Sequence, residues 1–131
     1  MSESDQTQEQ IADHLKFLGY EVTREDDSIL ASHPKKQAIM FKAFSVGTLH
    51  TSVWNTTDHA KHHKQGLLEY VNALNQGAGI TRYYVDKDLD LFVEALYVSD
   101  YDQTRYGQFL ELWDNDFTEF LKAPETNKYI D

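Results

Sequence analysis

The sequence contains no cysteine. Without thiols the chain forms no disulfide, no thiolate nucleophile, and no zinc or iron–sulfur site built on cysteine. Proline is scarce as well, with two residues in 131. No apolar run approaches the ~20 residues of a membrane-spanning helix, and the first residues lack the basic and apolar regions of a secretory signal. We therefore expect a soluble, cytoplasmic protein that does not bind membranes.

Basic residues are also few. Acidic residues outnumber them 22 to 12, which gives a formal net charge of -10. A field of that sign repels phosphate backbones and argues against nucleic-acid binding. Aromatic residues are plentiful instead, at 13% of the chain, and 40% of all residues are hydrophobic. A chain of this length and composition can bury one core. We expect a single domain over residues 1–131, with residues 1–6 and 125–131 frayed.

Apolar side chains recur at helical spacing in three segments, which we predict as helices at about residues 7–18, 58–76 and 102–121. Thr7 and Gln10 have the spacing of a capping box at the start of the first helix. The third helix has the strongest apolar stripe, and we assign its carboxylates Asp114 and Asp116 to the solvated face.

Six further segments are rich in β-formers and bounded by polar turns. They cover residues 20–24, 28–33, 38–44, 49–55, 80–85 and 91–98. The connections among the first four strands are too short for parallel crossovers, and residues 86–90 form a short hairpin link between the last two, so we predict an antiparallel sheet. The resulting order is α-β-β-β-β-α-β-β-α, which predicts an α+β domain with helices on an antiparallel sheet.

The segment from Asp58 to His63 looks most like a chemical site. His59 and His63 lie one helical turn apart, the spacing two imidazoles need to share a metal, and His62 lies beside them. Zincins place a Glu directly after the first His, whereas Ala60 occupies that position here, and the local sequence offers no third ligand. We favour a structural or surface role and expect no cofactor. A small metal-dependent enzyme or metal sensor using His59 and His63 remains the alternative.

Asp86, Asp88 and Asp90 have the spacing of the first carboxylates of an EF-hand. The sharp-turn Gly of that loop would fall at Leu91 and the bidentate Glu at Tyr97, so we predict a polar hairpin tip instead. No serine has the surroundings of a nucleophile elbow, and the glycines form no phosphate-binding loop. The sequence therefore predicts no catalytic residues.

A binding surface is the other reading of the helices. Leu112 lies off the apolar stripe of the third predicted helix, Tyr70 lies at the edge of the stripe of the second, and Leu68 lies beside it. Apolar side chains outside a core stripe can form a dimer or partner surface. The alternative is ordinary single exposure, which needs no explanation.

Several segments carry a family resemblance. The segments are FLGYEV at residues 17–22, LLEYVNALN at 67–75, RYYVD at 82–86 and LFVE at 91–94. This pattern resembles the YbjN-type family over about residues 10–121. The sequence departs from the family pattern at the hairpin tip, where Leu89 replaces the usual Gly of an Asp-Gly turn.

The YbjN-type family is described as bacterial sensory-transduction regulators and shares the fold of type III secretion chaperones. The resemblance implies a non-enzymatic domain, often dimeric, that binds or regulates other proteins, and it supplies no catalytic residues. We therefore expect a chaperone-like or regulatory homodimer with a protein partner. A permanent subunit of a larger assembly is a related hypothesis that the sequence does not separate from this one.

Overall fold

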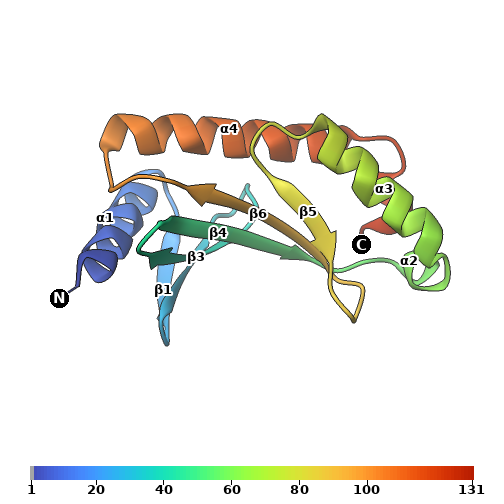
Figure 1. Cartoon of the computed structure of the whole chain (residues 1–131), viewed down its shortest axis with the longest axis horizontal. Helices are drawn as coiled ribbons and strands as arrows, with labels where there is room; N and C mark the ends of the chain where they lie inside the picture. The colour runs from blue at the N-terminus through green and yellow to red at the C-terminus, as the bar shows by residue number, and fades with distance from the viewer. Residues whose placement is uncertain (1) are drawn as a thin grey trace. The chain divides into compact units, whose positions relative to one another are not determined.

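The structure, a computed structural model, describes residues 2–131 and contains within them five helices and six strands (Figure 1). The helices are α1 (Glu3–Phe17), α2 (Asp58–His62), α3 (Lys64–Gly77), α4 (Gln103–Lys122) and α5 (Thr126–Tyr129). The strands are β1 (Glu21–Glu25), β2 (Ser28–Ser32), β3 (Ile39–Phe44), β4 (Gly47–Trp54), β5 (Arg82–Val85) and β6 (Leu91–Tyr97). The predicted α+β class is confirmed.

The strands form one sheet in the order β1-β2-β3-β4-β6-β5. Neighbours joined by short hairpins pair antiparallel: β1 with β2, β2 with β3, β3 with β4, and β5 with β6. The chain divides into two compact units. Unit 1 comprises the chain up to Ser52 together with Ala95–Leu110, and unit 2 comprises Val53–Glu94 and Glu111–Asp131. β4, β6 and α4 each contribute residues to both units.

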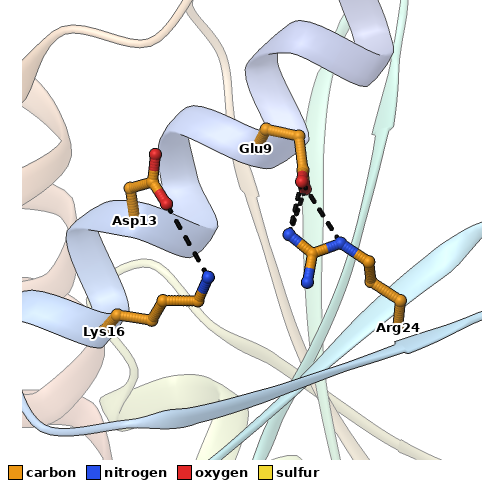
Figure 2. Close-up of polar contacts among 4 residues, drawn as sticks. All are labelled: Glu9, Asp13, Lys16 and Arg24. Carbon is orange, nitrogen blue, oxygen red and sulfur yellow. Dashed lines mark hydrogen bonds and ion pairs between the residues drawn. The ribbon is translucent and has the colours of Figure 1, made fainter.

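In unit 1, α1 packs on β1, β2 and β3. Ile11, Ala12 and Leu15 form its buried face, as their helical spacing predicts. An ion pair on the flank adds to this packing. The guanidinium of Arg24 on β1 donates to the Glu9 carboxylate on α1, with 3.2 Å from Nε to Oε1 (Figure 2). The edge strand of unit 1 is thereby tied to its helix.

The first helix begins earlier than predicted. Its N-cap is Ser2, whose Oγ accepts a hydrogen bond from the Asp5 amide at 3.1 Å, so the capping box proposed for Thr7 and Gln10 is wrong. Ser is a preferred N-cap, and the acidic first turn complements the positive end of the helix. Residues 3–6, which we expected to fray, are therefore helical.

The core of unit 1 surrounds a buried histidine. His50 is fully buried, its Nδ1 donates to the Thr48 carbonyl at 3.1 Å, and its Nε2 accepts from the Tyr106 hydroxyl at 2.8 Å. The rings of Phe41 and Phe109 pack against the imidazole, with centroids 5.7 and 4.7 Å away. Burial lowers the pKa of His50 to about 4, so the ring is neutral.

In unit 2, the predicted helix over residues 58–76 is divided at His63, which has φ -132° and ψ 60°. A continuous helix would direct the His63 amide to the His59 carbonyl. The His63 imidazole Nδ1 donates to that carbonyl instead, at 2.9 Å, and the amide bonds to Ala60. The side chain has therefore replaced the backbone donor at the point where the helix breaks.

The C-terminal residues of unit 2, which we expected to fray, are ordered by contacts with the rest of the unit. Residues 126–129 form α5, and the Tyr129 ring stacks on Tyr70 with 5.2 Å between centroids. Ile130 pairs with Thr56 in a β-bridge, and the Tyr129 carbonyl accepts from the Thr57 amide at 3.0 Å. Tyr129 and Ile130 are consequently buried.

Asp116 on α4 is buried, so its assignment to the solvated face is wrong. Its carboxylate accepts the amides of Gly79, Ile80 and Thr81, each at 2.9 Å, and the Thr81 hydroxyl at 2.8 Å. Burial alone would raise the pKa of this carboxyl, but the four hydrogen bonds outweigh it and lower the pKa below its usual value. Asp116 therefore fixes the α3–β5 connection as an anion.

Candidate partner-binding surface

One face of the unit 1 sheet carries apolar side chains that are exposed. Along β3, Ile39, Phe41 and Ala43 are buried on the face that α1 covers. The intervening residues point to the opposite face because successive side chains of a strand alternate. Two of them, Met40 and Phe44, are 41% and 46% exposed.

The neighbouring strands extend this apolar surface. Leu30 on β2 pairs with Met40, and Leu49 on β4 pairs with Lys42, so Leu30 and Leu49 share the face with them. Leu96 on β6 is 42% exposed and lies on the strand face opposite to that of its buried neighbours Ala95 and Tyr97. We call this surface the open sheet face. Its apolar members are Leu30, Met40, Phe44, Leu49 and Leu96.

Gly47 brings the β3–β4 hairpin close to β6. Its φ of 151° lies in the region that favours glycine, and a Cβ there would lie 2.5 Å from the Tyr97 carbonyl oxygen. The same Cβ would lie 3.3 Å from the Leu96 side chain. The absence of a side chain at Gly47 therefore lets Leu96 join the open sheet face beside the hairpin.

The lysine on this face is neutralised within the chain. Lys42 Nζ lies 2.6 Å from the Asp27 carboxylate and 5.1 Å from the centroid of the Phe44 ring. Its hydrogen bond lowers the pKa of Asp27 below the usual value. The Lys42 ammonium is already paired with the Asp27 carboxylate and lies near the Phe44 ring. An apolar partner can therefore cover this part of the sheet without burying an unpaired charge.

The three surface residues predicted on the helices differ in solvent exposure. Leu68 on α3 and Leu112 on α4 are 44% and 50% exposed. Tyr70 is 5% exposed, so its place on the predicted surface is wrong. Its hydroxyl lies 2.6 Å from the Thr126 Oγ1, and burial raises its pKa to about 12. Tyr70 lies in the core because α5, which the sequence pattern did not predict, packs against it.

His59 and His63 come close together, but not as metal ligands would. Their rings stack with centroids 4.0 Å apart and planes inclined by only 18°. A metal lies in the plane of each ligating imidazole, and two nearly parallel stacked planes meet only far from both rings. The residues described, 2–131, contain no group of three or more His, Asp or Glu side chains placed to hold a metal ion.

The Asp86–Asp90 turn uses its first carboxylate to hold the backbone. Asp86 Oδ1 accepts the amides of Asp88 and Asp90, each at 3.0 Å. Leu89 has φ 64°, a left-handed conformation, at the position where the family pattern has Gly. The predicted hairpin connection between β5 and β6 is present.

The two edge strands of the sheet are poor sites for adding a partner strand. β1 presents the exposed charges of Glu21, Arg24 and Glu25, and charge on an edge discourages pairing. On β5, the side-chain amide of Asn75 donates to the Tyr83 carbonyl at 2.9 Å and accepts the Tyr83 amide at 2.8 Å. Asn75 thus occupies the groups that a new strand would need, which leaves the open sheet face as the candidate surface.

The sequence contains a signal for this surface. In IMFKAF, residues 39–44, apolar residues occupy both phases of the strand alternation instead of one. A strand with one solvated face alternates apolar and polar residues, so Met40 and Phe44 mark a second apolar face. The β-propensity of the segment predicts a strand but does not by itself distinguish this second apolar face from a core face.

Comparison with known proteins decides the fold. No family model and no curated protein matches the sequence. Among solved structures, the crystal structure of YbjN, a putative transcription regulator from E. coli, matches with a TM-score of 0.74 over 94% of each chain. The chain has a YbjN-like fold. The resemblance stated from the sequence is thereby confirmed for the fold, and at 10% identity the likeness to YbjN shows nothing beyond it.

Over residues 2–131, the structure contains no helix with the length and apolar character that crossing a membrane requires.

Proposed function

We propose that the chain is a non-enzymatic protein-binding domain, chaperone-like or regulatory, that acts in the cytoplasm as a homodimer. The open sheet face is the surface through which it binds. Affinity comes from burial of apolar area there, and the net charge of -10 selects partners that are neutral or basic.

The observation that carries this proposal is the exposure of Met40, Phe44 and Leu96 on one sheet face. Single exposed apolar residues are ordinary, but a contiguous apolar patch on a folded domain marks an interaction site. Leu30 and Leu49, paired across strands with residues of the same face, connect these side chains. The YbjN-like fold supports the proposal by analogy, since YbjN is described as a putative transcription regulator.

The test combines light scattering after size exclusion with capture of partners on the immobilised chain. Met40→Asp places a charge in the open sheet face, and we expect it to abolish the dimer and the capture of a partner. Leu112→Asp and Leu68→Asp test the helix surface predicted from the sequence.

Leu121→Asp is the matched control, because Leu121 is a 54% exposed leucine outside both surfaces. Loss of association in Met40→Asp alone supports the open sheet face. Loss in Leu112→Asp or Leu68→Asp alone moves the site to the helices. A monomeric wild-type chain that retains no partner contradicts the proposal.

A further inference from the structure

A second feature of unit 1 lies at the end of the sheet where α1 begins. A cavity of about 230 Å³ is bounded by the first turns of α1, by the β3–β4 hairpin at residues 44–48, and by residues 98–100 after β6. Figure 1 shows these three segments at the same end of unit 1, near the N-terminus. The volume suits one side chain or a small polar molecule better than a drug-sized ligand.

Among residues 2–131, those that line the cavity are acidic, hydroxyl-bearing or apolar, and none is basic. Glu3 and Asp100 supply carboxylates, and neither forms a side-chain ion pair within residues 2–131. Elsewhere in unit 1 the carboxylates of Glu9 and Asp27 are paired with an arginine and a lysine. Within the described part of the chain, residues 2–131, the carboxylates at this cavity therefore have no cationic side chain as an ion-pair partner.

Thr48 is an independent sign that a polar group enters here. It lines the cavity, it is 1% exposed, and its Oγ1 has no hydrogen-bond partner among residues 2–131. A buried hydroxyl without a partner is destabilising, and most such groups in folded proteins are satisfied. By contrast His50, two residues along the same strand and on the same face, has both ring nitrogens bonded.

The rim of the cavity is apolar. Phe44, Val46 and Val98 line it and are 46%, 68% and 71% exposed. An occupant must therefore present a polar, positively charged tip to the interior and an aliphatic stem to the rim. Lysine has this construction, because its ammonium group has three donors and no acceptor on a four-carbon apolar stem.

We infer that the cavity receives a lysine side chain from an apolar segment of the partner polypeptide. The ammonium donates to the Thr48 hydroxyl and to the carboxylates of Glu3 and Asp100, and the flanking apolar residues of the segment cover Phe44 and Val98. This inference rests on the proposed function, since it specifies the partner's chemistry. The positive end of α1 opposes a cation with about half a unit charge, which two full carboxylate charges exceed.

The probe is a fluorescein-labelled, end-capped peptide of sequence Leu-Val-Lys-Val-Leu, followed by fluorescence anisotropy. We expect saturable binding that weakens with added salt, and about tenfold weaker binding when norleucine replaces the lysine. Pentylamine tests the bare ammonium and stem. If pentylamine binds as tightly as the peptide, the ligand is a free amine and the partner assignment is overturned. Equal binding of the lysine and norleucine peptides overturns the inference as a whole.

Thr48→Val separates a ligand contact from a structural role. The substitution preserves shape and removes the unpartnered hydroxyl, so we expect the urea midpoint of unfolding to stay or rise while the lysine peptide binds about tenfold more weakly. Asp100→Asn should weaken the peptide similarly. Asp26→Asn removes the same charge from the β1–β2 turn of unit 1, away from the lining residues, and should leave binding unchanged. Unaltered binding in both Thr48→Val and Asp100→Asn contradicts the inference.

The two proposals fail separately. If Met40→Asp disrupts association but the lysine peptide does not bind, the open sheet face stands and the cavity inference is wrong. If the wild-type chain is a monomer that captures no partner and the peptide also fails to bind, the proposed function itself is wrong.

Discussion

Each unit of the molecule contains a buried titratable side chain whose pKa is lowered, His50 in unit 1 and Asp116 in unit 2, and these two side chains carry different charges. His50 in unit 1 is fully buried and neutral, whereas Asp116 in unit 2 is 4% exposed and ionised. The hydrogen-bond partners account for the difference. His50 meets one acceptor and one hydroxyl, which suits a neutral imidazole, while Asp116 meets four donors, which suit a carboxylate.

Burial therefore does not by itself decide the charge of a core side chain. Burial lowers the pKa of His50, and the hydrogen bond to the Thr48 carbonyl only partly opposes this shift. Burial would raise the pKa of Asp116 if its four hydrogen-bond donors were absent. In both cases the folded pKa lies below its ordinary value, so both units lose stability in acid. They lose it over different pH ranges, because an imidazole and a carboxyl titrate in different ranges when unfolded.

The largest effect should come from removing the charge in unit 2. Asp116→Asn keeps the shape of the side chain but turns one acceptor into a donor that faces the amides of residues 79–81. We expect a loss of about 4 kcal/mol in the free energy of unfolding, because several buried donors lose their acceptor at once. Urea unfolding followed by tryptophan fluorescence measures the loss.

Glu119→Gln supplies the control for that experiment. It makes the same chemical change on α4 at an exposed position, so the unfolding free energy should change by less than about 0.5 kcal/mol. If Asp116→Asn is as mild as Glu119→Gln, the four hydrogen bonds do not stabilise unit 2.

The second effect tests the neutral histidine of unit 1. His50 has a folded pKa of about 4 against an ordinary value of 6.5, so the unfolded chain binds its proton first. The stability that the neutral ring contributes is complete above pH 6.5 and is lost as the pH falls towards 4. The total loss from this group is about 3 kcal/mol, at 1.4 kcal/mol per pH unit. Urea unfolding between pH 7.5 and 4 measures it.

His50→Gln is the matching variant, since its amide retains a donor and an acceptor but does not titrate. The variant will be less stable at pH 7.5, and the slope of its stability between pH 6.5 and 4 should be smaller by the histidine contribution. An unchanged slope in His50→Gln would mean that His50 is not the titrating group.

Sequence patterns predicted the elements well because each depends on local periodicity and turn residues. The same patterns failed where a partner distant in sequence decides the outcome. Asp116 lies among polar residues of α4 and seemed solvated, yet amides some thirty-five residues earlier bury it. Tyr70 lies at the edge of its helical stripe, and its contacts with Thr126 and Tyr129 of α5 make it a core residue.

The candidate binding site was predicted less well than the fold. The helix residues Leu68 and Leu112 are exposed as their positions suggest, but helical periodicity did not predict the open sheet face. The position of α1 decides which face of the sheet is covered, and therefore whether Met40 and Phe44 are exposed. Strand alternation alone does not specify where α1 packs. The cavity at Thr48 joins three segments separated in sequence, so no local pattern could reveal it.

The units also hold their edge strands differently, and a third effect tests this contrast. Unit 1 ties β1 to α1 through the side chain of Arg24, whereas unit 2 ties β5 to α3 through main-chain groups that bond to Asn75. Asn75→Ala should lower the unfolding free energy by about 1.5 kcal/mol, since two hydrogen bonds are lost. Asn72→Ala, at an exposed position of the same helix, should have little effect in the same urea experiment.

The smallest effect concerns the hairpin turns of the two units. Both contain a non-glycine residue at positive φ: Asp26 at 30° in unit 1 and Leu89 at 64° in unit 2. Aspartate tolerates this region, whereas leucine is strained in it. Leu89→Gly should therefore stabilise the chain by about 1 kcal/mol, the relief of strain being partly offset by the greater flexibility of unfolded glycine. The hydrogen bond that the Thr56 hydroxyl donates to the backbone carbonyl of residue 89 does not involve the leucine side chain and is retained. The neighbouring Lys87→Gly introduces the same flexibility without relieving strain and should destabilise slightly. If both glycine variants lower the urea midpoint equally, the left-handed leucine carries no strain that matters to stability.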